Sequence, residues 1–256
     1  MKHLQRKVCS LLCVLALLIS LLPVSAWAGD STIEPWTPPS APTDVRGSWT
    51  EPNNYDTSWY DSHENDSAYA YTLEDAEDLA GLAVIVNGLN GHEPDNFAGK
   101  TITLKAGETF DLSAHTWTPI GNSSNVDEYF KGTFNGNFEK GTTITGMIIL
   151  NANGKTGLFS TANSAIIENI RISTGYISAA RGSNIKVGGI VGYAYDATTI
   201  KECSFDGTIA TGNSSSSNDN YFGGIVGETN FKATIEQCQA DGTIFGNGTY
   251  MGGIVG

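Results

Sequence analysis

Four carboxylates in the C-terminal half of the chain could support acid–base chemistry: Asp196, Asp206, Glu228 and Asp241. Glycosidases use two carboxyl groups at a separation that suits a retaining or inverting mechanism. However, Asp206 and Asp241 each precede a glycine, which is typical of turn residues. The lysine or arginine base of a lyase is also scarce here. We therefore predict no catalytic residue, and we keep a carbohydrate-active β-helix enzyme, a glycosidase or lyase, as the alternative.

Other catalytic and metal motifs are incomplete in this sequence. A zinc peptidase helix needs His-Glu-x-x-His, but neither His63-Glu64 nor His92-Glu93 continues in that way. There is no Gly-x-Ser-x-Gly motif, and His115 is the only histidine in the β-rich region. Loops containing Asp196 and Asp219 could hold Ca²⁺ with backbone carbonyls, but no repeating calcium loop is present. We predict no metal site and no required cofactor.

Two cysteines could do redox chemistry, because Cys9 and Cys13 fall in the N-terminal leader described below. Cys203 and Cys238 occupy equivalent places in successive repeats. In a parallel stack such residues lie about 4.8 Å apart, which allows either a buried ladder of free thiols or a disulfide. We interpret them first as free thiols, with the disulfide as the alternative. A zinc site would need more ligands.

Five aromatic residues lie next to glycine-rich sequences and are our candidate ligand-binding residues: Tyr193, Tyr195, Tyr221, Phe231 and Tyr250. If exposed on adjacent coils, their rings could stack on sugar rings or contact a protein partner. The alternative is that they pack under loops or cover the ends of the core.

The element that positions these residues is a repeat. Val-Gly-Gly-Ile-Val-Gly at 187–192 recurs as 222–227 and 251–256 with a different first residue, at a period of roughly 29 to 35 residues. Such a period is typical of a solenoid. No lysine or helix follows the glycines, so they are not phosphate loops. We interpret them as packing positions: Gly189, Gly192, Gly224, Gly227 and Gly253.

Period-two alternation between the repeats predicts an all-β fold. Ile170 and Ile172 align with Cys203 and Phe205 and then with Cys238 and Ala240, with polar residues between. Short strands with apolar ladders predict a right-handed parallel β-helix over 99–256. A β-propeller-like repeat is the alternative. Before it, 67–98 would form an N-terminal cap whose helix, over 72–87, begins at a capping-box-like Thr72.

The N-terminus has the pattern of a secretory signal peptide. A basic start and an apolar run lead to Ala26-Trp27-Ala28, so we expect cleavage between Ala28 and Gly29, with an uncleaved anchor as the alternative. Residues 29–66 would form a proline-rich arm, unless its aromatic residues pack on the open end of the solenoid.

The net charge is −13 for the whole chain, and loss of Lys2, Arg6 and Lys7 would leave 11 − 27 = −16. This charge argues against nucleic-acid partners and anionic membranes. No transmembrane segment is expected in the mature chain.

The repeated Gly-Gly-Ile-Val-Gly, the Ile-x-x-Cys strand and the later Gly-x-Ile resemble the GLUG-motif repeat of bacterial surface proteins and of some immunoglobulin-A-specific peptidases. The resemblance extends to Trp117-Thr-Pro-Ile-Gly121 and covers roughly 69–256. It implies a secreted or cell-surface, non-enzymatic structural and adhesive stalk that binds a glycan or a host or matrix protein. Another possibility is a targeting module of a larger peptidase. Because the chain ends inside a repeat, we expect it to be a fragment of a longer protein.

Overall fold

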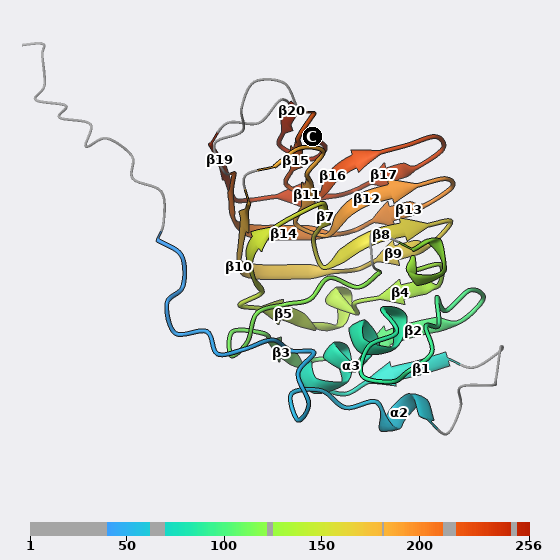
Figure 1. Cartoon of the computed structure of the whole chain (residues 1–256). Coiled ribbons are helices and arrows are strands. Elements are labelled where there is room, and N and C mark those ends of the chain that lie inside the picture. The colour runs from blue at the N-terminus through green and yellow to red at the C-terminus, as the bar shows by residue number, and fades with distance from the viewer. Residues whose placement is uncertain (1–39, 62–69, 122–124, 181, 212–218, 247–249) are drawn as a thin grey trace, which may run out of the picture. The chain divides into compact units, whose positions relative to one another are not determined.

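Short strands stack in parallel from one repeat to the next in the computed structural model, and they form a β-helix of about five turns (Figure 1). The structure describes residues 40–61, 70–121, 125–180, 182–211, 219–246 and 250–256, which belong to one compact unit. The predicted signal peptide, its cleavage site, the start of the arm and His63-Glu64 lie outside the described residues. All pairings between the described strands are parallel, so the β-propeller alternative, which needs antiparallel blades, is wrong.

The described strands form four sheets, in which neighbours come from successive coils. The first sheet runs in the order β1 (Ala70–Leu73), β2 (Thr101–Leu104), β4 (Thr133–Asn135), β9 (Ile166–Glu168), β13 (Thr199–Lys201) and β17 (Thr234–Glu236). The second runs β18 (Gln239–Ala240), β14 (Ser204–Ala210), β10 (Arg171–Ala179), β5 (Thr143–Thr145) and β3 (Thr109–Asp111), with β19 (Thr243–Phe245) paired to β14 and β6 (Ile148–Ala152) paired to β10.

Two smaller sheets complete the later coils. One runs β20 (Tyr250–Gly252), β15 (Tyr221–Gly223), β11 (Lys186–Gly188) and β7 (Lys155–Thr156). The other runs β16 (Val226–Thr229), β12 (Val191–Tyr195) and β8 (Phe159–Asn163). The described helices are α2 (Ser58–Asp61), α3 (Ala76–Val86) and the short 3-10 helices η2 (Val126–Glu128) and η3 (Phe138–Lys140).

The core consists of apolar columns that run through these sheets. The middle residues of the first sheet stack in register and are buried through the first five coils: Tyr71, Ile102, Phe134, Ile167 and Ile200, followed by the half-buried Ile235. The polar residues on either side of them point outward, as the alternation predicted. One repeat cannot bury these side chains alone, so stacking supplies the hydrophobic stabilisation.

Helix α3 lies at the N-terminal end of the β-helix (Figure 1) and begins four residues later than the sequence predicted. Thr72 lies in β1, where it pairs with Thr103, so strand pairing replaces the expected first helical turn. The helix is instead capped by Asp75, whose carboxylate accepts from the Asp78 backbone N–H at 3.0 Å. The Asp78 carboxylate accepts in turn from the Glu74 N–H at 2.7 Å. The arrangement resembles a capping box, except that the second bond comes from the residue before the N-cap.

Asp78 should make the stability of the N-terminal cap depend on pH. Burial raises the pKa of its carboxyl from 3.8 to about 6. A carboxyl group whose pKa is higher in the folded state stabilises the fold while it is protonated. This stability is fully present below the pKa of the unfolded chain and is lost as pH rises through the pKa of the folded protein. We expect Asp78→Asn, which can still accept from Glu74, to be about 1 kcal/mol more stable than wild type at pH 7.5. The advantage should disappear near pH 4 in denaturant titrations, and an advantage independent of pH would contradict this account.

The described part of the arm packs on the β-helix, which is the alternative that the sequence left open. Trp49 is buried and donates its indole N–H to the Leu112 carbonyl at 3.0 Å. Trp59 and Tyr60, in α2, pack against Tyr71, with ring centroids 5.2 and 5.9 Å away. These contacts cover the first coil with aromatic side chains.

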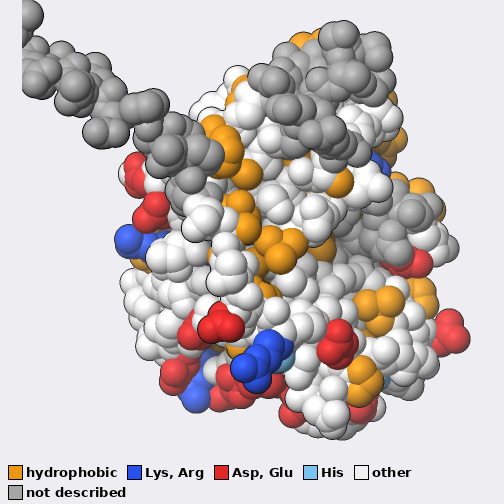
Figure 2. All heavy atoms as spheres, turned by 60° about the vertical axis from the view of Figure 1, so that its left-hand side comes forward, with side chains coloured by type: hydrophobic (Ala, Val, Ile, Leu, Met, Phe, Trp, Pro, Cys, Tyr) orange, Lys and Arg blue, Asp and Glu red, His pale blue; other side chains and the backbone are white. Residues whose placement is uncertain are grey.

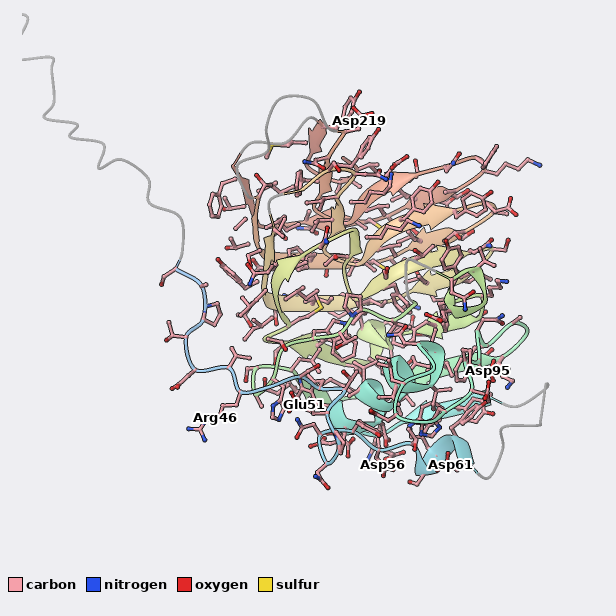
Figure 3. All side chains as sticks on the ribbon, viewed as in Figure 1. Arg46, Glu51, Asp56, Asp61, Asp95 and Asp219 are labelled. Atoms are coloured by element: carbon pink, nitrogen blue, oxygen red, sulfur yellow. The ribbon has the colours of Figure 1, made fainter. Side chains whose placement is uncertain are left out.

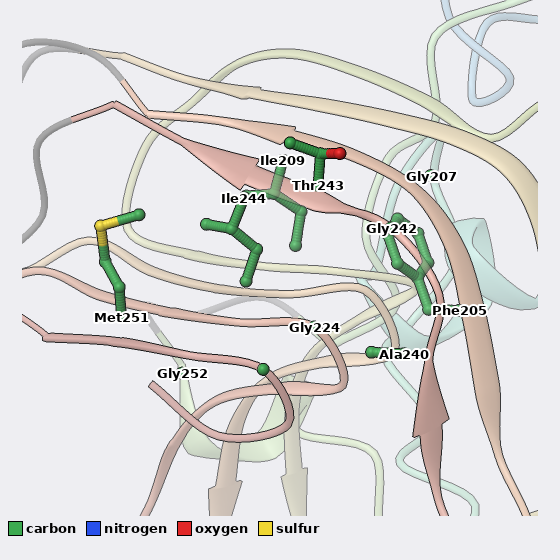
Figure 4. A pocket seen from close by; sticks show the side chains of 11 residues that line it. Phe205, Gly207, Ile209, Gly224, Ala240, Gly242, Thr243, Ile244, Met251 and Gly252 are labelled. Atoms are coloured by element: carbon green, nitrogen blue, oxygen red, sulfur yellow. The ribbon is translucent and has the colours of Figure 1, made fainter. Parts of the chain in front are cut away.

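The last coils of the β-helix contain a cavity. An apolar cavity of about 280 Å³ lies among the last coils, where Phe205, Ile209, Ile244 and Met251 surround it (Figure 4). Met251 is 42% exposed. On the face around β10 and β14, hydrophobic side chains form a strip, and most of the visible charged side chains lie below it (Figure 2). Asp219 lies near the last coils, whereas Asp56, Asp61 and Asp95 lie near the first coils (Figure 3).

Candidate functional site

The five candidate aromatic residues lie in two groups of touching rings on the last coils. Tyr221 and Tyr250 are stacked, with ring centroids 4.7 Å apart and planes 12° apart. Tyr195 contacts Tyr193 at 5.8 Å and meets Phe231 edge to face at 5.7 Å. The two groups come from different sheets, so sequence spacing alone did not show whether they meet.

Two lysines connect these groups into one surface. The Lys186 ammonium lies 5.1 Å from the Tyr193 ring centroid and 4.8 Å from that of Tyr221. Lys155 lies in the same way between Tyr129, at 5.2 Å, and Tyr193, at 4.8 Å. Each cation–π contact contributes about 0.5–2 kcal/mol, depending on desolvation. We call the resulting series the aromatic–lysine row: Tyr129, Lys155, Tyr193, Lys186, Tyr221 and Tyr250.

Strand register explains the row. Lys155, Lys186, Tyr221 and Tyr250 occupy one column of the sheet β7-β11-β15-β20, each paired with the next. Tyr193 belongs to the neighbouring sheet, where it is paired with Thr161 on β8 and Glu228 on β16. The row therefore forms where the side chains of two sheets meet.

Polar contacts hold the centre of the row in place. Lys186 is largely buried and forms an ion pair with Glu228, and the Asn230 side-chain amide donates to the Tyr193 hydroxyl at 2.8 Å. Burial, followed by the positive charge of Lys155, lowers the pKa of Lys186. Burial also raises the pKa of the Tyr221 phenol, so it stays protonated at neutral pH. The centre thus has two adjacent ammonium groups, a carboxylate paired with Lys186, and the negative charge of Asp219 acting on Lys186 and Tyr221.

Phe231 is the most exposed of the candidate aromatic residues. Its side chain is 75% exposed and its φ is 56°, in the left-handed region. The pairing of Ala194 with Thr229 places Phe231 at the corner that Asp196 and Ser164 occupy in the preceding coils, and both of these are also left-handed. Small polar residues tolerate that conformation, whereas a bulky aromatic is disfavoured. The exposed ring therefore replaces a residue better suited to the corner.

The other carboxylates are not gathered with Glu228 in any group that could hold a metal. Within the described residues, no cluster of three or more His, Cys, Asp or Glu side chains is found. Asp196 accepts from the Ser164 hydroxyl at 3.3 Å, and Asp241 accepts from the Gln239 amide at 2.5 Å. Asp206 is an exposed residue of β14.

Cys203 and Cys238 are free thiols, stacked on successive coils. Each donates to the carbonyl two residues before it, Lys201 or Glu236, at 3.2 Å. Burial raises the pKa of Cys203 well above its usual value, whereas the hydrogen bond with Cys203 lowers the pKa of the half-buried Cys238 to about 7. Cys238 is therefore the more reactive thiol.

The repeat glycines pack against backbone. A Cβ at Gly189, Gly192, Gly224 or Gly227 would overlap backbone atoms of an adjacent coil or loop, whereas Gly253 has open space around it. None of them has a positive φ, so close approach of the chain, and not a special turn, requires glycine there.

Sequence reasoning missed Tyr129, Lys155 and Lys186 as site residues. A signal was present for Lys186, because the residue before each copy of the repeated sequence is Lys186, Tyr221 or Tyr250. Aligning these three positions on successive coils would have placed Lys186 in one column with Tyr221 and Tyr250. Nothing comparable marks Tyr129, which comes from the loop after η2.

The comparison with protein families found one match, the GLUG motif, over residues 183–210. Neither a curated protein nor a solved structure matched the chain. The matched segment contains β11, β12, β13 and β14, one strand from each of the four sheets, so it corresponds to one turn of the solenoid. The chain thus carries a GLUG motif as a turn of a parallel β-helix, consistent with a GLUG-motif repeat protein.

Proposed function

We propose that this protein is an exported, non-enzymatic β-helix of the cell surface that binds a glycan or a matrix ligand through the aromatic–lysine row and Phe231. The observation that carries the proposal is Phe231, an aromatic ring 75% exposed at a corner where the preceding coils have Ser164 and Asp196. An exposed aromatic in a disfavoured backbone conformation has a stability cost, which suggests a use outside folding.

The other residues of this surface also support a role in ligand binding and not only a role in packing. Tyr250 is 47% exposed and stacks on Tyr221, so the row continues to an accessible ring. Rings of this kind contact sugar faces or apolar protein surfaces, and hydroxyl, amide and carboxylate groups lie beside them for hydrogen bonding. Stacked coils form a stiff support because each buries the apolar face of its neighbour.

Export is proposed from the leader-like N-terminus, with Ala28–Gly29 as the cleavage site. In the part of the chain that the structure describes, no helix has the length and apolar character needed to cross a membrane. The absence of catalysis is proposed because Glu228, the carboxylate nearest the row, is held by Lys186.

Replacing Phe231 by asparagine should separate binding from stability. Asparagine tolerates the left-handed conformation, so the free energy of unfolding should stay the same or rise. Loss of one stacking ring should weaken binding to a glycan or matrix ligand about tenfold. Glycan and matrix-protein arrays would identify the ligand, and calorimetry would measure its affinity for both proteins.

The matched control is Phe138→Asn, because Phe138 is 37% exposed and lies against Arg171, outside the row. It should leave the affinity unchanged. Equal losses of affinity in both variants, or an affinity unaffected by Phe231→Asn, would contradict the assignment of ligand binding to this surface. Turnover of a bound polysaccharide by the wild-type protein would refute the non-enzymatic role.

A further inference from the structure

Lys155 is a half-buried cation that forms no ion pair with any carboxylate whose side chain the structure describes. Its ammonium donates a long hydrogen bond, 3.5 Å, to the Tyr129 hydroxyl. An ammonium group has three N–H donors, so Lys155 can serve further acceptors.

The described carboxylates near the row act on Lys186 and form no ion pair with Lys155. Lys155 and Lys186 are paired across adjacent rungs of the sheet, Glu228 forms an ion pair with Lys186, and the negative charge of Asp219 also acts on Lys186. Adjacent ammonium groups repel each other, and an anion placed beside Lys155 would relieve that repulsion. The site therefore has charge complementarity for an anionic group.

The rings on either side of Lys155 restrict what can carry that anion. The Lys155 ammonium lies over the Tyr129 and Tyr193 rings, at 5.2 and 4.8 Å, so an anion bound there also meets aromatic surface. Tyr250 at the end of the row, and Phe231 beside Tyr195, present exposed rings that suit the flat C–H faces of sugars. A chain of sugar rings with carboxylate groups satisfies both requirements, whereas a phosphodiester chain or an acidic peptide supplies the charge without the sugar faces.

The geometry points to a uronic-acid polysaccharide as the ligand, with a sugar carboxylate at Lys155 and pyranose rings against the exposed aromatic residues of the surface. This inference rests on the proposed function and specifies its ligand class. Lys155 selects for the carboxylate, and the aromatic rings supply contacts that a neutral sugar could share.

The test measures binding of the full chain to polygalacturonate and to the same polymer after chemical reduction of its carboxyl groups. Binding should be about tenfold or more tighter to the charged polymer, because a hydrogen-bonded ion pair is lost on reduction. The preference should shrink as NaCl rises from about 50 to about 500 mM.

Variants of Lys155 identify the residue responsible. Lys155→Met should lower affinity for polygalacturonate about tenfold more than affinity for the reduced polymer, whereas Lys155→Arg should keep the preference. Lys140→Met, at an exposed lysine of η3, is the matched control and should have no effect. Circular dichroism and the melting temperature would show that each variant is folded.

The possible failures can be told apart. Equal binding to both polymers, or to the neutral polymer alone, would leave the proposed function in place and overturn the uronate assignment. Equally tight binding to polyphosphate, with the same loss in Lys155→Met, would show a site for charge alone and would also overturn it. Binding to a matrix protein but to no polysaccharide would also overturn the uronate assignment. If the protein bound no ligand at all, both proposals would be rejected.

Discussion

Replacing Gly192 by alanine is expected to lower the free energy of unfolding by about 3 kcal/mol or more. The new Cβ would overlap the Thr156 backbone N and lie 2.8 Å from the Lys155 carbonyl carbon and from the Ser160 carbonyl oxygen. These are backbone atoms of the preceding coil, which is covered on both sides, so no side chain can rotate away to make room. Guanidinium unfolding followed by circular dichroism and tryptophan fluorescence would measure the change.

Gly253→Ala provides the control at an uncrowded glycine of the repeat. Gly253 is equivalent to Gly189 and Gly224 in the earlier copies, but nothing lies within 4 Å of its would-be Cβ. Its substitution should change the free energy of unfolding by less than about 0.5 kcal/mol. Similar losses in the two variants would mean that glycine is needed for its own backbone conformation, which contradicts the role in close packing.

Phe159→Ala is expected to cost about 3–5 kcal/mol, because it opens a cavity in the centre of the β-helix. The ring is fully buried, and its centroid lies 5.1 Å from that of Phe130 and 5.2 Å from that of Phe134. Since Phe130 comes from a loop and Phe134 from β4, the cavity would weaken contacts between different parts of two coils. Denaturant titration of the purified variant would measure the loss.

Phe138→Ala serves as the control for Phe159→Ala. Phe138 is 37% exposed in η3, so its truncation opens a space that water can enter and not an enclosed cavity, and it should cost clearly less, about 1–2 kcal/mol. A loss at Phe159 no greater than this would show that the core around β8 can collapse to fill the space.

Much of the fold follows from the sequence because a solenoid repeats its local pattern. The alignment of Ile172 with Phe205 and Ala240 is confirmed by strand register, as are the stacked positions of Cys203 and Cys238. Period-two alternation decides which side chain faces inward, and a one-residue shift would expose the whole apolar set. The register is therefore readable from the repeats alone.

The start of the N-terminal helix shows where local signals fail. Thr72 has the features of a helix cap, but pairing with Thr103, about 30 residues later in the chain, keeps it in a strand. A pairing partner at that distance in the sequence leaves no mark on the local pattern. Tertiary contacts therefore override the capping preference, and Asp75 takes over the cap.

For the proposed binding surface, the sequence by itself determined the five aromatic residues and the repeat that carries them. Only the tertiary structure decided that Lys155 and Lys186 lie between those rings and that Phe231 is an exposed left-handed corner. The physical reason is that stacking of the coils pairs equivalent residues within one sheet, and the sequence repeat shows which residues are equivalent. Contacts between side chains of two sheets depend on the corner that joins them, which the repeat pattern does not encode.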